Sequence, residues 1–170
     1  ASGGLKAPKF KIKKHLIASQ IKTHRPFGGV VPNLAKQEHL ANLPVLFNKI
    51  WKLKIKNWKL PDIIAVTVGP GLEPCLWQGI NFAKEIQKTH FPKAKIIGTN
   101  HMHGHMYSFL LTQKTTSDLQ LPTSNFFPAV QLIVSGGHTM LVLMETLTKF
   151  RLLGQTRDDA VGECFDKAAR

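Results

Sequence analysis

The chain has 170 residues, of which 43% are hydrophobic and 19% charged, a composition that is typical of a globular protein and excludes a disordered one. No apolar run is long enough to cross a bilayer, so we expect no membrane association. Lysine and arginine number 23 against 10 acidic residues, and this net charge of +13 favours contact with RNA, although a Lys-rich surface facing water would give the same count.

Hydrophobic periodicity and turn residues predict that strands and helices alternate along the chain. We expect strands at 15–20, 63–68, 95–99 and 150–153, and two more on either side of residues 135–139. We expect helices at 33–54, 75–89 and 100–111 and from about 158 to the end, with a polar loop at 112–126. Strands that alternate with helices and are followed by a hairpin indicate an α/β layer fold with a mixed sheet.

The stretch Gly69-Pro70-Gly71 joins the predicted strand 63–68 to the next helix. Backbone N–H groups at a helix start can hold an anion or let another chain approach closely. A sharp turn between strand and helix explains the same residues equally well, so both interpretations stay open here.

Two histidines in the stretch NHMHGHMYS, His101 and His105, are four residues apart. In a helix both side chains project from one face and can share a metal ion, whereas His103 points elsewhere. The pattern is not that of a metalloprotease, because Met102 occupies the place of the general base. From spacing alone, ordinary surface histidines explain the pair better than a metal site does, and no third ligand stands out.

The stretch QLIVSGGHTMLVLME places Gly136 and Gly137 between two apolar runs. Two glycines at this position are favoured in a tight hairpin turn, which makes a phosphate-binding loop the minority interpretation of this stretch by itself. Further on, Asp158 and Asp159 suit a helix N-terminus because the helix dipole favours acids there. Asp166 lies two turns deeper, and we expect it to form a surface salt bridge or to contact a ligand.

Taken together, five stretches resemble the tRNA N6-adenosine threonylcarbamoyltransferases of the bacterial TsaD type, formerly called O-sialoglycoprotein endopeptidases. These stretches occur in that family's order and cover about residues 15–170. They are HRPFGGVVPNLAKQEH, VGPGLEPCLWQGINFAKEI, NHMHGHMYSFLL, PAVQLIVSGGHTMLV and LLGQTRDDAVGECFDKAAR.

The resemblance implies an actin-like, Hsp70-like and sugar-kinase-like (ribonuclease H-like) fold, with a basic segment at 1–14 and a partial first lobe at 15–170. It implies transfer of threonylcarbamoyl from threonylcarbamoyl-adenylate to N6 of the adenosine next to the anticodon, in tRNAs that read codons beginning with A. The family's metal, iron or zinc, would be held by His101 and His105. The substrate would contact Asp166 and the loop Ile133, Val134, Ser135, Gly136 and Gly137.

The chain also departs from the family's pattern. The usual opening strand and hairpin are missing, as are the second lobe and the Asp that completes the metal site, so the chain resembles a first lobe truncated at both ends. Asn33 stands where Glu is usual. Partner subunits of the TsaB and TsaE type are expected if the source is bacterial, although Glu73-Pro74-Cys75 alters the turn near which such partners bind.

Two other functions remain open from the sequence. The first is a binding protein without activity, which keeps the basic surface and holds tRNA or a partner lobe. The second is a metallopeptidase, which the missing Glu at position 102 argues against. With only Cys75 and Cys164 we expect a reducing compartment, the cytoplasm or alternatively the mitochondrion, and two small buried thiols without a catalytic role.

Overall fold

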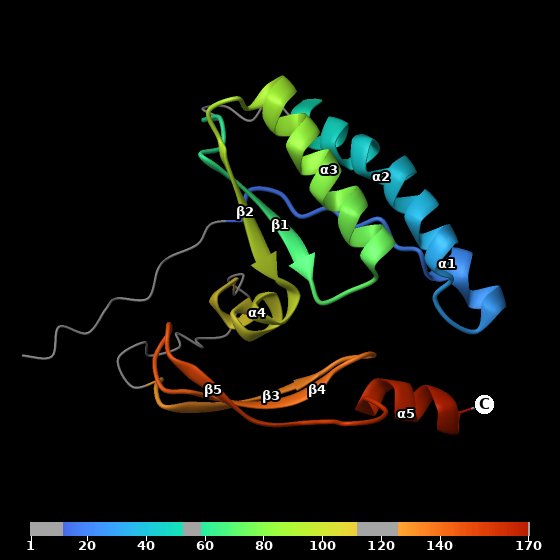
Figure 1. Cartoon of the computed structure of the whole chain (residues 1–170), viewed down its shortest axis with the longest axis vertical. Coiled ribbons are helices and arrows are strands. Elements are labelled where there is room, and N and C mark those ends of the chain that lie inside the picture. Colours follow the sequence, from blue (N-terminus) through green and yellow to red (C-terminus); the bar gives the residue numbers. More distant parts are fainter. Residues whose placement is uncertain (1–11, 53–58, 112–125, 170) are drawn as a thin grey trace, which may run out of the picture. The chain divides into compact units, whose positions relative to one another are not determined.

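The computed structural model describes residues 12–52, 59–111 and 126–169, which fall into two compact units (Figure 1). We call Ile12–Gly104 the helix unit and the part from His105 onward the sheet unit. The division falls within one short helix. The predicted boundary between residues 14 and 15 stays a prediction, because most of the basic segment lies outside the described residues.

The helix unit contains a long helical pair and two strands. Its elements are α1 (Ile21–His24), the 3-10 helix η1 (Arg25–Phe27), α2 (Pro32–Lys52), β1 (Ile63–Gly69), α3 (Glu73–His90) and β2 (Lys95–Asn100). Helix α2 begins at Pro32, one residue before the predicted start, because the fixed φ of proline suits the first helical position. Gly28 ends η1 with a φ of 68°, a left-handed conformation that glycine adopts without steric cost.

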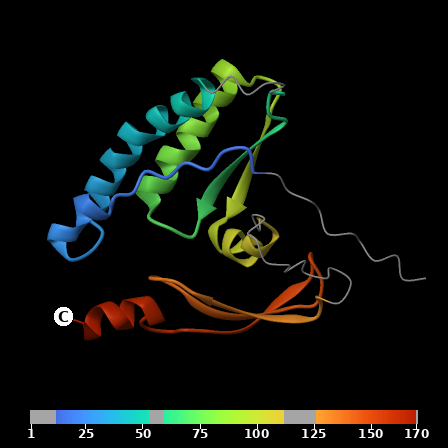
Figure 2. The same ribbon diagram turned by 180° about the vertical axis from the view of Figure 1, so that it is seen from behind.

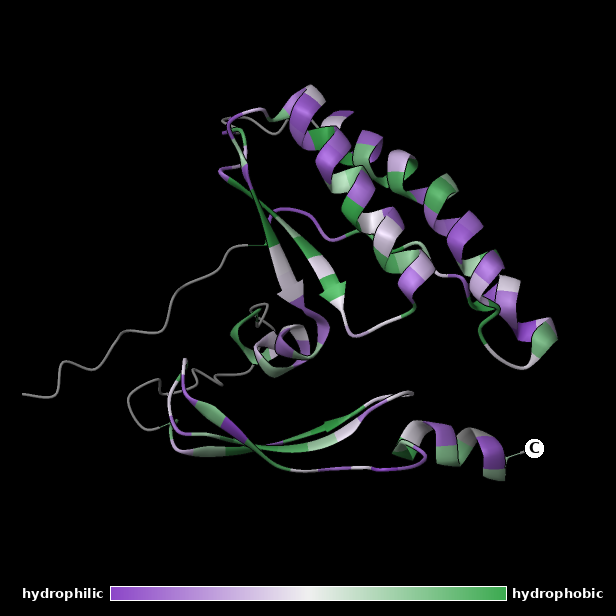
Figure 3. Cartoon of the chain, viewed as in Figure 1, coloured by the Kyte–Doolittle hydropathy of each residue, from purple (hydrophilic) through white to green (hydrophobic). Residues whose placement is uncertain are grey.

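Strands β1 and β2 pair in parallel, with α3 as the crossover between them. The register runs from Ile63 opposite Lys95 to Thr67 opposite Thr99. Helices α2 and α3 lie side by side along one side of this strand pair in both views (Figure 2). Polar and apolar residues are interspersed along the two helices (Figure 3).

Aromatic rings hold the far ends of α2 and α3 together. Phe47 on α2 lies with its ring centroid 6.0 Å from that of Phe82 on α3. Trp51, one helical turn after Phe47, meets Phe91 at the end of α3 at 5.6 Å. Edge-to-face pairs at these distances contribute about 0.5–1.5 kcal/mol each beyond the burial of their area.

The predicted strand at residues 15–20 is wrong. Residues 12–20 have no regular secondary structure, although Leu16, Ala18 and Gln20 are half-buried and the residues between them are exposed. That alternation is the pattern of a strand, but a strand also needs a hydrogen-bonded neighbour, and the described residues offer none here. Strand β1 confirms the strand predicted at 63–68, although both ends of its apolar run are exposed, Ile63 to 53% and Val68 to 51%.

The sheet unit is an antiparallel hairpin extended by a third strand and a helix. After helix α4 (His101–Met106), which crosses the division, come the 3-10 helix η2 (Ser108–Leu111), β3 (Ala129–Val134), β4 (Thr139–Met144), β5 (Phe150–Gln155) and α5 (Val161–Ala168). The strand order is β3-β4-β5, and the hairpin register runs from Ala129 opposite Met144 to Val134 opposite Thr139. Its small core centres on Met106, Ile133, Val142 and Met144, none more than 7% exposed.

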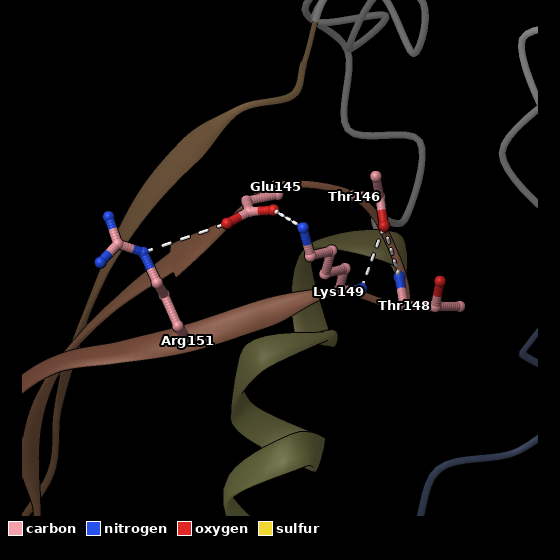
Figure 4. A network of polar contacts seen from close by, with 5 residues as sticks. All are labelled: Glu145, Thr146, Thr148, Lys149 and Arg151. Carbon is pink, nitrogen blue, oxygen red and sulfur yellow. Dashed lines mark hydrogen bonds and ion pairs between the residues drawn. The ribbon is translucent and has the colours of Figure 1, made fainter.

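The tight turn that joins β4 to β5 is held by side-chain contacts (Figure 4). The Glu145 carboxylate pairs with Lys149 at 2.5 Å and lies 4.0 Å from the Arg151 guanidinium. The Thr146 hydroxyl accepts hydrogen bonds from the backbone N–H groups of Thr148 and Lys149. The hydrogen bond from Lys149, and then its charge, lowers the pKa of the Glu145 carboxyl.

The predicted α/β class is confirmed, since helices occur with both parallel and antiparallel strands. The predicted polar loop lies almost wholly outside the described residues. Cys75 is half-buried, and burial raises the pKa of its thiol, whereas Cys164 is exposed, against expectation. In the part of the chain that the structure describes, none of the helices is long and apolar enough to span a membrane.

Candidate functional site

Helix α4 carries both predicted metal ligands, His101 and His105. Asn100 caps its start, because the Asn100 Oδ1 atom accepts a hydrogen bond from the Met102 N–H at 2.8 Å. The predicted helix 100–111 breaks at Tyr107, after which the chain continues as the 3-10 helix η2. The four-residue spacing of the two histidines therefore falls inside one helix, and helical geometry places both on one face.

The three histidines of α4 are exposed, whereas Met102 is buried. Among residues 12–52, 59–111 and 126–169 there is no group of three or more His, Cys, Asp or Glu side chains that could hold a metal ion. Two imidazoles are part of the donor set of a zinc or non-haem iron site, and the described residues do not complete it.

The second part of the site is the loop between β3 and β4, which the Ser135 side chain shapes. The Ser135 N–H donates to the His138 carbonyl oxygen at 2.8 Å, and the His138 N–H donates to the Ser135 hydroxyl at 3.0 Å. Gly136 and Gly137 form the tip of this loop, so the predicted tight hairpin turn is confirmed. The Ser135 hydroxyl thus accepts the hydrogen bond of the His138 N–H, which in a plain hairpin would go to a backbone carbonyl oxygen.

The two loop glycines have no steric reason to be glycine. A Cβ atom on either would meet nothing within 4 Å, and neither has a positive φ. Both residues are exposed, and among the described residues their N–H groups donate no hydrogen bond. The loop therefore presents two backbone N–H groups without a hydrogen-bond partner among the described residues, and the Gly136 nitrogen lies close to Gly162 of α5. Exposed backbone donors of this kind suit an anionic group.

Helix α5 packs unusually close to this loop. A Cβ atom on Gly162 would lie 2.8 Å from the Ser135 carbonyl oxygen and 2.9 Å from the Gly136 Cα atom, closer than real Cβ contacts come. Thr139, the first residue of β4, ties the same region together. Its hydroxyl accepts from the Val161 N–H at 2.9 Å, and its carbonyl accepts from the Thr156 N–H at 2.9 Å.

Acidic residues near α5 have different surroundings from those predicted. Asp158 and Asp159 precede the helix, which begins at Val161. The Asp159 carboxylate accepts a hydrogen bond from Lys167 at 2.6 Å. This bond, together with a second one that Lys167 donates to the Glu163 carboxylate, raises the pKa of the Lys167 ammonium. Asp166 lies in α5, and its side chain is outside the described part of the structure.

Sequence reasoning did not find the pocket that adjoins the loop. This pocket has a volume of about 260 Å³ and is lined by His105, Ser108 and the strand residues Gln131–Val134. Two of the predicted substrate contacts, Ile133 and Val134, and one predicted metal ligand, His105, thus line one cavity of the sheet unit. Gln131 and Ser108 were missed because nothing in the local sequence pattern separates them from ordinary strand and turn residues.

Comparison with known proteins shows which family this chain belongs to. The sequence model of the family described as "TsaD: tRNA N6-adenosine threonylcarbamoyltransferase" matches residues 11–170. A protein of that name from Maridesulfovibrio salexigens is 42% identical over 160 residues, which are 94% of this chain and 42% of the relative. One from Fervidobacterium nodosum is 43% identical over 156 residues, 92% of this chain and 43% of the relative. The chain therefore spans less than half the length of these curated relatives.

Proposed function

Because this chain belongs to the tRNA N6-adenosine threonylcarbamoyltransferase family, we propose that it forms part of an enzyme that transfers a threonylcarbamoyl group to N6 of an adenosine in tRNA. The donor is threonylcarbamoyl-adenylate, and the target is the adenosine next to the anticodon in tRNAs that read codons beginning with A. The proposal concerns the protein that carries this chain, since the relatives are more than twice as long as the matched region.

The observation that carries the proposal is the pair of unpaired N–H groups at Gly136 and Gly137. Threonylcarbamoyl-adenylate contains a mixed carboxyl-phosphate anhydride, and backbone N–H groups are suited to its anionic oxygens. When N6 of adenosine attacks the carbamoyl carbon, the new N–C bond replaces the bond between that carbon and the phosphate oxygen. AMP leaves with the electron pair of the broken bond, N6 releases one proton to solvent, and negative charge develops on the oxygens around the reacting carbon. Donors already held in place by Ser135 and Gly162 stabilise that charge without having to reorganise.

The metal belongs to the same proposal. The two imidazoles of α4 fit half of an iron or zinc donor set, and the third protein ligand comes from a part of the protein outside the described residues. When bound, such a metal acts as a Lewis acid that polarises the threonylcarbamoyl carbonyl. The substrate then extends from the glycine loop along the pocket toward His105, with Asp166 on α5 as a further contact.

The tRNA substrate accounts for the charge of the chain. A net charge of +13 raises the local concentration of a polyanion and speeds its encounter with the protein. Most of the excess is lysine, which suits contacts to phosphates better than the reading of bases. We propose further that the protein works in the cytoplasm and assembles with partner subunits of the TsaB and TsaE type.

The test is whether the loop glycines are needed for the adenylate. The protein that carries this chain is incubated with threonylcarbamoyl-adenylate and tRNA, and the nucleosides are then analysed by mass spectrometry. We expect Gly137→Val to lower product formation at least tenfold, because the side chain fills the space in front of the N–H groups. Gly154→Val is the control, since a Cβ on Gly154 in β5 also meets nothing within 4 Å. Equal activity in the two variants would refute the role of the loop.

The same assay separates enzyme from binding protein. A protein that binds tRNA, with an affinity that falls linearly with salt on logarithmic axes, but never forms the modified nucleoside is a binding remnant of the family. Such a result would end the catalytic proposal while keeping the family assignment.

A further inference from the structure

Gln131 is a polar residue on the inward side of strand β3. Along β3 the residues alternate, so that Ala129, Gln131 and Ile133 are half-buried or buried while Val130 and Leu132 are 61% and 66% exposed. The Gln131 Oε1 atom is buried and has no hydrogen-bond partner among the described residues. An unpartnered buried oxygen lowers stability, so an apolar side chain would suit this position better on packing grounds alone.

The other end of the amide makes a specific contact. The Gln131 Nε2 atom donates a hydrogen bond of 2.6 Å to the carbonyl oxygen of Met106, the last residue of α4. Carbonyl groups at a helix C-terminus have no hydrogen-bond partner within the helix. The Met106 carbonyl finds its partner in Gln131, which lies on a strand 25 residues further along the chain. The hydrogen bond therefore ties the end of α4 to the sheet.

Two more hydrogen bonds act on the same end of the helix. The Ser108 hydroxyl donates to the His105 carbonyl oxygen at 2.8 Å. The Tyr107 hydroxyl donates to the Leu147 carbonyl oxygen at 2.7 Å, in the turn between β4 and β5. The Gln131 hydrogen bond from β3 and the Tyr107 hydrogen bond to the β4–β5 turn thus fix the end of α4 at two places, next to His105, which lines the pocket.

We propose that Gln131 is a positioning residue that fixes the C-terminal end of α4, and with it the His105 imidazole at the pocket. This inference rests on the proposed function in so far as His105 is a metal ligand. Removing a group that orients a metal ligand without touching the metal itself typically lowers metal affinity about 10- to 100-fold. The stability that the orphaned oxygen costs is offset by the fixed position of the ligand-bearing helix.

The test compares Gln131→Met with Gln155→Met in the protein that carries this chain. Methionine has nearly the same shape as glutamine and removes only the polar atoms. Gln155 is an exposed residue of β5 in the same unit, so it controls for the loss of an amide. Three quantities are measured: the affinity for Zn²⁺ by calorimetric titration, the exchange rate of α4 amide hydrogens without metal, and the thermal unfolding midpoint.

We expect Gln131→Met to weaken Zn²⁺ binding about tenfold and to speed amide exchange in α4. The unfolding midpoint should change little, because the variant removes one unpartnered buried oxygen but leaves the Met106 carbonyl without its partner. Gln155→Met should match the wild type in all three. Equal Zn²⁺ affinity and equal exchange in the two variants would overturn the proposal. A midpoint that falls together with the affinity would also overturn it, because Gln131 would then be needed only for folding.

A His105→Ala variant separates this inference from the proposed function. It should abolish Zn²⁺ binding by the otherwise unchanged chain. If it does not, the metal site of the proposed function fails, and the exchange of the α4 amides still decides whether Gln131 holds the helix.

Discussion

Replacing Gly162 with alanine tests whether the close contact between α5 and the glycine loop is required. Two effects oppose each other. Alanine is favoured over glycine in a helix by up to about 1 kcal/mol. Against this, the new Cβ atom would lie 2.8 Å from the Ser135 carbonyl oxygen and 2.9 Å from the Gly136 Cα atom. Both neighbours are backbone atoms, so no side-chain rotation relieves the overlap and the loop or the helix must move.

Such overpacking typically costs about 1–3 kcal/mol, which outweighs the gain in helix propensity. We therefore expect Gly162→Ala to lower the local stability of the loop by up to about 2 kcal/mol. Hydrogen exchange of the Ser135 amide, which donates to the His138 carbonyl, should become about tenfold faster, since each 1.4 kcal/mol is a factor of ten.

Gly154→Ala is the matched control, because its Cβ meets open space in the same unit. The three tryptophans Trp51, Trp58 and Trp77 all precede residue 105, so their fluorescence reports on a different part of the chain and should not change. A Gly162→Ala variant whose loop is as stable as the wild type, or more so, would refute the reasoning and show that helix propensity prevails.

Three further outcomes follow from single contacts. Asn100→Ala removes the cap of α4 and should destabilise this helix by about 1 kcal/mol, which is measured as faster amide exchange in α4. Unchanged exchange would show that the cap does not stabilise the helix. Tyr107→Phe should lower the free energy of unfolding in urea by about 1 kcal/mol, because the half-buried hydrogen bond to the Leu147 carbonyl is lost; no change would mean that water replaces the hydroxyl. Lys149→Met should raise the pKa of Glu145 toward that of a free carboxyl, measured by carbon-13 NMR titration. Because the pKa of Glu145 is lower in the folded state, the ion pair stabilises the fold at pH values above the unfolded-state pKa. This stabilisation is lost as the pH falls through the folded-state pKa. If the pKa of Glu145 is the same in the variant as in the wild type, Lys149 is not the cause of the shift.

Local sequence patterns predicted most of the regular elements. The helical spacing of apolar residues from Leu34 onward located α2, and the apolar runs around Gly136 and Gly137 located the β3–β4 hairpin. These predictions were confirmed because helices and hairpins depend mainly on residues close in the chain. The break of α4 at Tyr107 was missed, since its hydroxyl bonds to a carbonyl 40 residues away.

The wrong strand at 15–20 has a related cause. Alternating burial at Leu16, Ala18 and Gln20 satisfies the pattern, but a strand exists only when another strand pairs with it. Local sequence carries the pattern and not the partner. The metal ligands His101 and His105 and the substrate contact Asp166 stay predictions, which the experiments above address.

By itself, the sequence determined the helices, the hairpin, the basic charge and, through five ordered motifs, a family membership that comparison confirmed. Only the tertiary structure decided why Gly162 has no side chain and which carbonyl Gln131 binds. The physical reason is range. Periodicity and turn chemistry act between neighbours in the chain, whereas the contacts that shape the loop and hold α4 join residues about 25 positions apart, and only packing brings them together.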